Sequence, residues 1–349
     1  MLCDARVQDE RRRKVIFLVP TYAAESVSFV AYQYVTAMRR RGIDARICSL
    51  RRSEMPHDEL VCRSKWELLG CDTLVTNLLL PDLLGFVLSR LLPWIRWRPF
   101  LHCHIIGGLA AERKPFARAK AWVWRAILST APVLAAPSRY ALRSVPNARR
   151  TAVIPHCIEP AIEAAFRSLA RSGTAAATAT DDATPAPCAD TDTLSYVFIG
   201  RDTRAKRLRS LLGLLQTNPM INIKVIGALD HSRRMFDALP ASQAARCQIL
   251  GQQFDPYAYV LTGDIVVCPS GREGFGLVPI ECLARDIPVA VIDEGAFKEL
   301  YGGMSIVYDR VANLPRSAAK LTRDNAAIRE RFIGASVLDQ RVDLLWAIL

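Results

Sequence analysis

The chain has 349 residues, 51% of them hydrophobic and 23% charged, which is typical of a folded globular protein with about two domains. Ten cysteines form no Cys-x-x-Cys pair and no metal-ligand spacing, so a zinc ribbon or a disulfide framework is not expected. The net charge is +12, and residues 1–165 hold an excess of eleven positive charges. Such a basic half suits an anionic membrane or nucleic acid, or it is a solvated surface.

The first half alternates short apolar runs with longer helical segments. Arg11–Ala24 mimics a secretory signal, but its apolar run ends at Val19 before a proline, so a buried strand is expected instead. Alternation of this kind predicts parallel β/α units. The expected strands are Val15–Pro20, Ala45–Leu50, Thr73–Thr76 and Phe100–Ile106, and the expected helices are 26–41 and 81–95.

Leucines and tryptophans crowd the segment 78–97, LLLPDLLGFVLSRLLPWIRW. Asp82, Arg90 and Pro93 interrupt it too often for a bilayer span, and no other stretch is long enough. Its flanking arginines predict a helix that lies in the membrane interface. The alternative is a helix that simply covers the first sheet.

The second half repeats the alternation after a pause. Residues 169–193 are rich in Ala, Thr, Asp and Pro, which predicts a linker or disordered insert. Strand-like runs then recur at Tyr196–Ile199, Ile223–Ile226, Cys247–Leu250, Ile265–Cys268 and Pro288–Ile292. We therefore expect an α/β protein of two doubly wound domains, with boundaries at 1–165, 166–193 (linker), 194–324 and 325–349 (C-terminal helix).

The segment Pro269–Glu281, PSGREGFGLVPIE, holds the strongest functional signal. Pro279 suits the first turn of a helix, and the amides of Gly274 and Gly276 can approach a diphosphate closely because glycine has no side chain. Glu281 lies among apolar neighbours and needs a partner, which sugar hydroxyls could supply. The alternative is an ordinary turn with two solvated glutamates.

Two cations follow another predicted strand. Arg201 comes after Gly200, and Lys206 lies five residues further on, so both can converge on one anion at the carboxyl end of the strand. Arginine grips phosphate oxygens with a planar fork and lysine adds a compact charge, so the pair can stabilise a leaving diphosphate. The alternative is a solvated basic loop.

These motifs together resemble the retaining glycosyltransferases of family 4, whose donor signature is Glu, seven residues, Glu in an E-G-F-G-L-x-x-x-E setting. The resemblance extends over most of the chain. Ser195–Lys206, Val153–Glu159 (VIPHCIE) and Phe100–Gly107 (FLHCHIIG) are similar to family landmarks in the expected order. It implies a GT-B fold, with two Rossmann-like domains facing a cleft, an N-terminal domain for the acceptor and a C-terminal domain for the nucleotide sugar.

The resemblance also implies roles for residues. Glu273 would contact the donor sugar, Glu281 the ribose, and His104 would lie near the donor sugar. Glu299 matches only weakly and is expected on a helix surface. The implied catalytic residues are Glu273, His104, Arg201 and Lys206, and the implied donor-binding residues are Gly200, Arg201, Lys206, Glu273, Gly274, Phe275, Gly276, Leu277 and Glu281.

The resemblance implies no cofactor and no metal, since the cation pair replaces one; the lone Asp-x-Asp triplet, Asp190–Asp192, lies in the linker. The chain departs from the family after its first strand, where PTYAAESVS has no glycine, and at His156 and Cys157, which replace an Asn-Gly turn. These changes leave the acceptor open.

The sequence thus predicts a cytoplasmic, peripheral membrane enzyme that moves a sugar from a nucleoside diphosphate sugar to a lipid-linked or glycan acceptor in glycolipid or polysaccharide assembly. One alternative is a sugar-nucleotide epimerase or phosphorylase of the same fold. Another is a basic membrane or nucleic-acid binding module with a vestigial donor site. Nucleic acid is disfavoured as a partner, because aromatic residues do not alternate with the basic ones.

Overall fold

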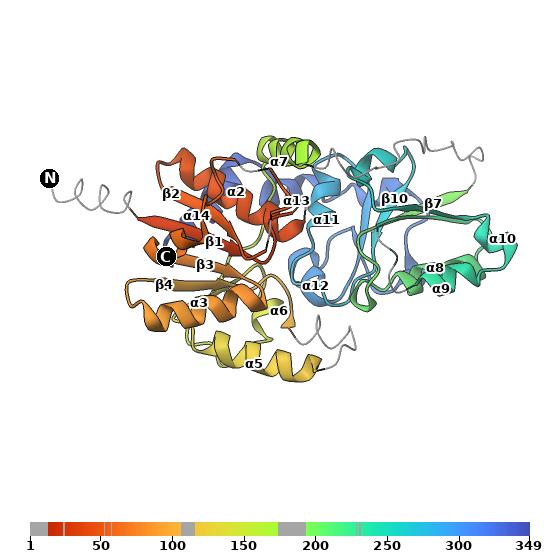
Figure 1. Cartoon of the computed structure of the whole chain (residues 1–349). Coiled ribbons are helices and arrows are strands. Elements are labelled where there is room, and N and C mark those ends of the chain that lie inside the picture. The colour runs from red at the N-terminus through yellow and green to blue at the C-terminus, as the bar shows by residue number, and fades with distance from the viewer. Residues whose placement is uncertain are drawn as a thin grey trace. The chain divides into compact units, whose positions relative to one another are not determined.

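The computed structural model describes residues 13–23, 25–51, 53–56, 58–105, 116–173, 193–227, 229 and 232–349. These form two compact units (Figure 1). Among the described residues, the first unit holds 13–105, 116–173 and 332–349, and the second holds 193–331. Gly107, at the end of one predicted motif, and the predicted Asp190–Asp192 triplet lie outside the described residues.

The first unit is built on a parallel six-stranded sheet in the order β2-β1-β3-β4-β5-β6. Five of the six residues of β1 are buried, as expected for a central strand covered on both faces. The order reverses between β1 and β3, which makes the sheet doubly wound. The strands are β1 Lys14–Val19, β2 Asp44–Ser49, β3 Thr73–Asn77, β4 Arg96–Phe100, β5 Leu134–Ala136 and β6 Thr151–Val153.

Helices cover both faces of this sheet (Figure 1). One group packs around α2 and includes α7 and α14, and the other joins α3 to α5. Gly85 lets α3 approach the sheet, because a Cβ there would lie 2.5 Å from Trp97. The helices are α2 Ser26–Arg40, α3 Leu79–Leu91, α5 Ala117–Ser129, α6 Arg139–Leu142, α7 Pro160–Gly173 and α14 Ala335–Trp346, with a 3-10 turn η1 at Lys65–Gly70.

Two predictions in this unit are wrong. The strand expected at Phe100–Ile106 lies earlier, at β4, and ends at Phe100, where its ladder with β3 also ends. The segment 78–97 is accordingly not one helix, since α3 ends at Leu91 and Trp97 is buried in β4. The strand was not predicted because arginines are unusual in a covered strand. Here Arg98 is satisfied by a distant contact, since it donates to the backbone carbonyl oxygen of Ile348.

The second unit holds another parallel six-stranded sheet, in the order β12-β11-β10-β7-β8-β9. Read from β9, this is the 3-2-1-4-5-6 order of a dinucleotide-binding fold, with its switch point between β7 and β10. All five predicted strands of this half are present. The strands are β7 Leu194–Ile199, β8 Ile221–Ile226, β9 Cys247–Gly251, β10 Ile265–Cys268, β11 Val289–Ile292 and β12 Val307–Tyr308.

Short helices follow the strands of the second unit. Here α8 packs on β8, α11 on β10 and β11, and α12 on β11 and β12. The helices are α8 Leu208–Thr217, α9 Arg233–Asp237, α10 Ala241–Ala244, α11 Leu277–Leu283 and α12 Gly295–Tyr301, with 3-10 turns η2 Arg204–Lys206, η3 Pro256–Tyr259, η4 Val311–Asn313 and η5 Ala318–Leu321. The predicted α/β class with two doubly wound sheets is therefore confirmed.

The predicted segment boundaries need two corrections. The linker expected at 166–193 begins too early, because α7 continues to Gly173 and buries Phe166 against Tyr22, Phe29 and Tyr32. The C-terminal segment 325–349 is not one helix but α13 (Asn325–Phe332) and α14, separated at Gly334. α14 packs on α2 in the first unit, where Arg41 bonds to Asp339 and Asp343.

Candidate functional site

The predicted donor residues gather at the switch point of the second sheet. The loop after β7 carries Gly200, Arg201 and Lys206, and the loop after β10 carries the Glu273 turn. Strands β7 and β10 are hydrogen-bonded neighbours, so their carboxyl ends, and the loops that follow, lie together. A doubly wound sheet binds its ligands in this place.

Lys206 and Glu273 form an ion pair, with 2.5 Å between Nζ and Oε1. Burial alone would lower the pKa of Lys206, but the carboxylate of Glu273 outweighs it, so the pKa is raised. Burial would likewise raise the pKa of Glu273, but Lys206 and a hydrogen bond from Ser270 lower it. Both groups are therefore charged at neutral pH, and Glu273 is the counterion of the predicted phosphate-binding lysine.

Arg201 lies beside this pair and is exposed. Its positive charge opposes the rise in the pKa of Lys206, so the two cations lie close enough to interact, and their convergence on one anion stays a prediction. Gly200 turns the chain at φ 136°, and its N–H donates to the carbonyl oxygen of Ile226 at 2.9 Å.

Helix α12 packs against the turn around Glu273. Gly276 has φ 80°, and a Cβ there would lie 2.5 Å from the ring of Phe297, so only glycine fits. Gly274 and Phe275 are buried. Helix α11 begins at Leu277, and Pro279 lies in its first turn, as predicted. Ala296 N–H donates to the carbonyl oxygen of Glu273 at 3.3 Å.

Glu281 has a partner that the sequence did not reveal. The hydroxyl of Tyr257, on η3, donates to Oε2 of Glu281 at 2.5 Å. Arg285 lies 4.5 Å over the Tyr257 ring and donates to the backbone carbonyl of Glu281 at 2.8 Å. Glu281 therefore has a hydrogen-bond donor within the protein, and a sugar hydroxyl stays a predicted further donor, because an acceptor oxygen can take more than one.

A second ion pair lies next to the first. The guanidinium of Arg207 donates to both carboxylate oxygens of Glu294, at 2.6 and 2.7 Å, across Gly271. Sequence reasoning missed both residues, because Glu294 follows a different strand, β11. Two features of the sequence could have indicated them: Arg207 directly follows Lys206, and Glu294 lies just after the end of a predicted strand. Glu299, which matched the family weakly, lies on the exposed part of α12.

The predicted histidine, His104, belongs to the first unit. It lies beyond the end of β4, and its ring packs against Tyr140 with 4.7 Å between centroids and the two planes tilted by 31°. His102 and His104 do not lie on one face of a strand, because β4 ends at Phe100.

His102 instead forms a partly buried chain of hydrogen bonds with Asn77 and His156. Its Nε2 lies 2.5 Å from Oδ1 of Asn77, and its Nδ1 lies 3.2 Å from Nε2 of His156. Asn77 donates its amide to Leu18 O, which leaves Oδ1 as the acceptor and places the His102 proton on Nε2. His156 must then donate from Nε2. Burial lowers the pKa of His102 to about 3, and burial and the neighbouring His102 lower the pKa of His156 well below its usual value.

The crossover turn at His156 and Cys157 has a backbone that suits these residues. Neither residue has a positive φ, so the turn does not use the left-handed backbone that an Asn-Gly pair favours. His156 is instead buried between Phe100 and His102 rings. The replacement therefore serves packing.

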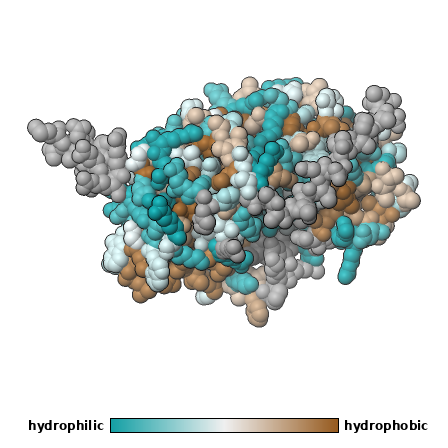
Figure 2. Space-filling view, turned by 45° about the horizontal axis from the view of Figure 1, so that its top comes forward, coloured by the Kyte–Doolittle hydropathy of each residue, from teal (hydrophilic) through white to brown (hydrophobic). Residues whose placement is uncertain are grey.

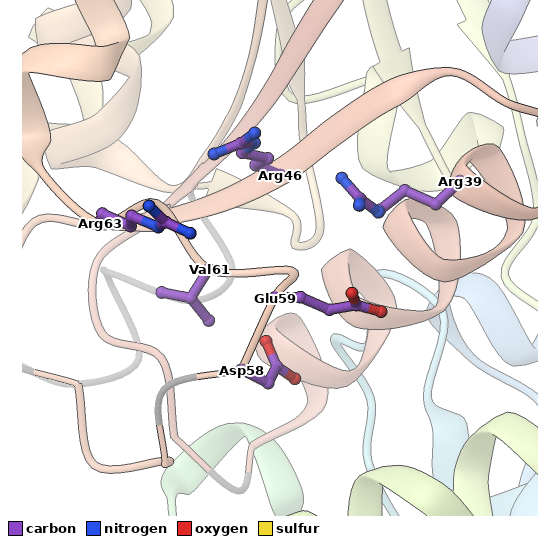
Figure 3. Close-up of a pocket in the computed structure, with 6 residues that line it drawn as sticks. All are labelled: Arg39, Arg46, Asp58, Glu59, Val61 and Arg63. Carbon is purple, nitrogen blue, oxygen red and sulfur yellow. The ribbon is translucent and has the colours of Figure 1, made fainter.

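A polar pocket in the first unit is unrelated to these motifs. Figure 3 shows arginine and carboxylate side chains gathered around it. Arg46 is already paired with Asp44 and Glu67, so the charges of the pocket largely compensate one another. Its lining residues are Arg39, Arg46, Asp58, Glu59, Val61 and Arg63.

In the described ranges, no group of three or more His, Cys, Asp or Glu side chains is arranged to hold a metal ion. Metal independence stays a prediction. None of the helices that the structure describes has the length and apolar content needed to cross a bilayer.

Sequence comparison with known proteins matches part of the chain. Residues 185–309 match the family model described as glycosyl transferases group 1. Over 102 residues the chain is 31% identical to the lipopolysaccharide core biosynthesis mannosyltransferase LpsB of Rhizobium meliloti (strain 1021). This match covers 28% of the chain and 29% of that protein, so the chain spans less than a third of the length of this curated relative.

Solved structures match over nearly the whole chain. HepE of Anabaena in complex with UDP-glucose aligns with a TM-score of 0.66 at 16% identity, covering 96% of this chain and 100% of that one. Sucrose-phosphate synthase from Thermosynechococcus elongatus aligns with a TM-score of 0.63 at 16% identity, covering 96% and 95%. The chain therefore has the GT-B fold, with two Rossmann-like units, and its second unit carries sequence similarity to glycosyl transferases group 1.

Proposed function

We propose that the protein is a retaining glycosyltransferase that moves a sugar from a nucleoside diphosphate sugar to a hydroxyl of a lipid-linked acceptor. The observation that carries the proposal is the Lys206–Glu273 pair at the switch point of the second sheet, inside the segment similar to glycosyl transferases group 1. A cation for the diphosphate and a carboxylate for the sugar lie side by side there. HepE, a neighbour in fold, binds UDP-glucose, so uridine donors are the first to test.

The proposed chemistry uses the charges of this site. The bond between the sugar and the diphosphate breaks, and the diphosphate leaves with the bonding electrons. Arg201 and Lys206 stabilise the negative charge that develops on it. Glu273 orients the sugar, and Glu281, held by Tyr257, positions the ribose. The acceptor oxygen bonds to the sugar carbon, and its proton passes to an oxygen of the departing diphosphate.

Two measurements test this mechanism together: the activity without divalent metal and the anomeric configuration of the product. With two cations at the diphosphate, transfer should proceed in EDTA, and the product should keep the anomeric configuration of the donor. Activity in EDTA is measured with a panel of nucleoside diphosphate sugars, and the anomer is read from proton NMR of the product. An inverted anomer, or activity that only manganese or magnesium restores, would contradict the proposal.

The lipid-linked acceptor is supported by the surface of α3 and α5. Asp82 anchors α3 by accepting from Thr76 Oγ1 at 2.6 Å and from Trp124 Nε1 at 2.7 Å, and burial raises its pKa to about 7. The opposite side of α3 is exposed, and apolar surface is visible at the lower left of Figure 2, on the side where Figure 1 draws α3. The exposed apolar residues are Leu80, Leu83, Val87 and Leu91 on α3, Trp94 after it, and Trp122 and Val123 on α5.

This apolar face is bordered by exposed cations. They are Arg90, Arg96, Arg118 and Lys120. Leu83, Val87 and Leu91 recur at intervals of four residues and form one stripe, which suits an acyl boundary, while the cations suit anionic headgroups. Each basic residue near an anionic surface contributes about 1 kcal/mol, so four give reversible attachment.

We therefore expect the protein to sediment with anionic vesicles at low salt, less at high salt, and not with neutral vesicles. Leu83→Glu with Leu91→Glu should abolish sedimentation, because it places charges in the stripe. Leu344→Glu, on α14, is the matched control, since Leu344 is also exposed but lies outside this face. Wild-type protein that stays in the supernatant with anionic vesicles would favour a soluble acceptor.

A further inference from the structure

The ion pair between Arg207 and Glu294 joins two loops of the candidate donor site. Arg207 directly follows Lys206, and Glu294 follows β11 and precedes α12. The pair is bidentate, with Nη1–Oε1 at 2.6 Å and Nη2–Oε2 at 2.7 Å. Two parallel hydrogen bonds fix the relative orientation of the groups as well as their distance.

Stability alone does not account for this pair. Arg207 has φ 54° and ψ 33°, a left-handed backbone that is strained for a residue with a Cβ. Its side chain is 40% exposed and that of Glu294 is 41% exposed, and ion pairs in contact with water contribute little to folding. A glycine would suit the backbone of position 207 better.

The surroundings of the pair show what it holds. Gly271 lies beneath it, where a Cβ would come within 2.4 Å of the Arg207 guanidinium and 2.5 Å of Glu294. Gly271 N–H donates to the carbonyl oxygen of Ala205 at 3.3 Å, which ties the lysine loop to the loop after β10. The segment after Glu294 also holds Glu273, through the amide of Ala296.

Glu294 thus begins a segment that fixes both partners of the Lys206–Glu273 pair. It holds the lysine side through Arg207, the next residue in the chain. The same segment holds the glutamate side through the backbone of Ala296. A shift of the β11–α12 loop would move Lys206 and Glu273 relative to one another, and a displacement of about 1 Å can cost roughly 100-fold in rate.

We propose that Arg207 and Glu294 are positioning residues that hold Lys206 at the donor diphosphate. The assignment rests on the proposed function. Arg207 acts through Lys206, so its effect should appear in the environment of that lysine as well as in catalysis.

The test compares Arg207→Gly and Glu294→Gln with wild type. Glycine accepts the backbone of position 207 without strain, so Arg207→Gly should fold and unfold at the same temperature as wild type or higher. Its kcat/KM should nevertheless fall about 10- to 100-fold. Arg207→Lys keeps the positive charge but lacks the planar guanidinium, so its kcat/KM should lie between those of wild type and Arg207→Gly. Arg310→Gln, which breaks the exposed Arg310–Asp309 pair, is the control and should match wild type.

A second readout follows Lys206 itself. Acetic anhydride labelling at fixed pH, quantified by mass spectrometry, should modify Lys206 faster in Arg207→Gly and in Glu294→Gln than in wild type, because its pairing with Glu273 is loosened. Equal labelling of Lys206, or an unchanged kcat/KM in both variants, would overturn the positioning role.

The two proposals fail in different ways. A wild-type protein that binds none of UDP, GDP and ADP in calorimetry would overturn the proposed function. The labelling comparison needs no donor, and it would still decide whether Arg207 and Glu294 hold Lys206.

Discussion

Replacing Arg201 and Lys206 together with alanine should reduce kcat by about 10²- to 10³-fold for each cation removed, or ~2–4 kcal/mol of transition-state stabilisation. The reason is that both charges stabilise a diphosphate whose charge grows as the sugar bond breaks. Initial rates with a saturating donor give the effect. In Lys206→Ala the carboxylate of Glu273 also loses its counterion, so this single variant should be more impaired than Arg201→Ala.

Two comparisons separate this effect from general damage. Lys320→Ala removes an exposed lysine of the same unit and should leave the rate unchanged. Glu281→Gln should mainly raise the dissociation constant for the donor, because its expected role is to position the ribose. Full transfer activity in the Arg201→Ala, Lys206→Ala protein would show that the donor site lies elsewhere.

Acid should destabilise the first unit through its buried histidines. Their folded pKa values are lowered, to about 3 for His102 and well below the usual value for His156, whereas the unfolded chain titrates near ~6.5. Above the unfolded pKa neither state binds the protons. As the pH falls below it, only the unfolded state binds them, so the free energy of unfolding drops by about 1.4 kcal/mol per pH unit for each histidine.

The predicted loss is therefore up to about 2.7 kcal/mol per pH unit for the pair, between pH 6 and 4. Urea unfolding followed by tryptophan fluorescence measures it, since all six tryptophans lie in the first unit. His156→Phe should halve this slope. Phe100→Leu, whose ring stacks on both histidines, should lower stability at every pH without changing the slope. Equal slopes in wild type and His156→Phe would refute the assignment of a buried neutral pair.

Much of the fold follows from local patterns. The runs Ile265–Cys268 and Tyr196–Ile199 are apolar, β-branched or aromatic, and bounded by turn residues, so they were predictable. β4 was not, because Arg96 and Arg98 were interpreted as the charged flank of an interfacial helix over 78–97. Arg98 bonds to backbone near the other end of the chain, a contact that no local pattern contains. The short strands β5 and β6 have only three residues each and leave little signal.

The candidate site divides in the same way. Lys206 and Glu273 were predictable because each follows a strand in a motif of fixed spacing. The partners Tyr257 and Glu294 were not, because they come from loops after β9 and β11 and reach the site only through the order of strands in the sheet. The contact between His102 and His156 was not predictable either. They are far apart in sequence, and only the fold brings them into one hydrogen-bonded chain.

The most direct test of the central claim is calorimetric titration of the wild-type protein and of Lys206→Ala with UDP, GDP and ADP. The account predicts that at least one nucleoside diphosphate binds the wild type and stabilises it, by about 2.7 kcal/mol at 100 times its dissociation constant. Lys206→Ala should bind the same ligand at least about tenfold more weakly, a loss of ~1.4 kcal/mol. Equal affinity in the two proteins, or no binding of any of the three to the wild type, would contradict a donor site at Lys206 and Glu273.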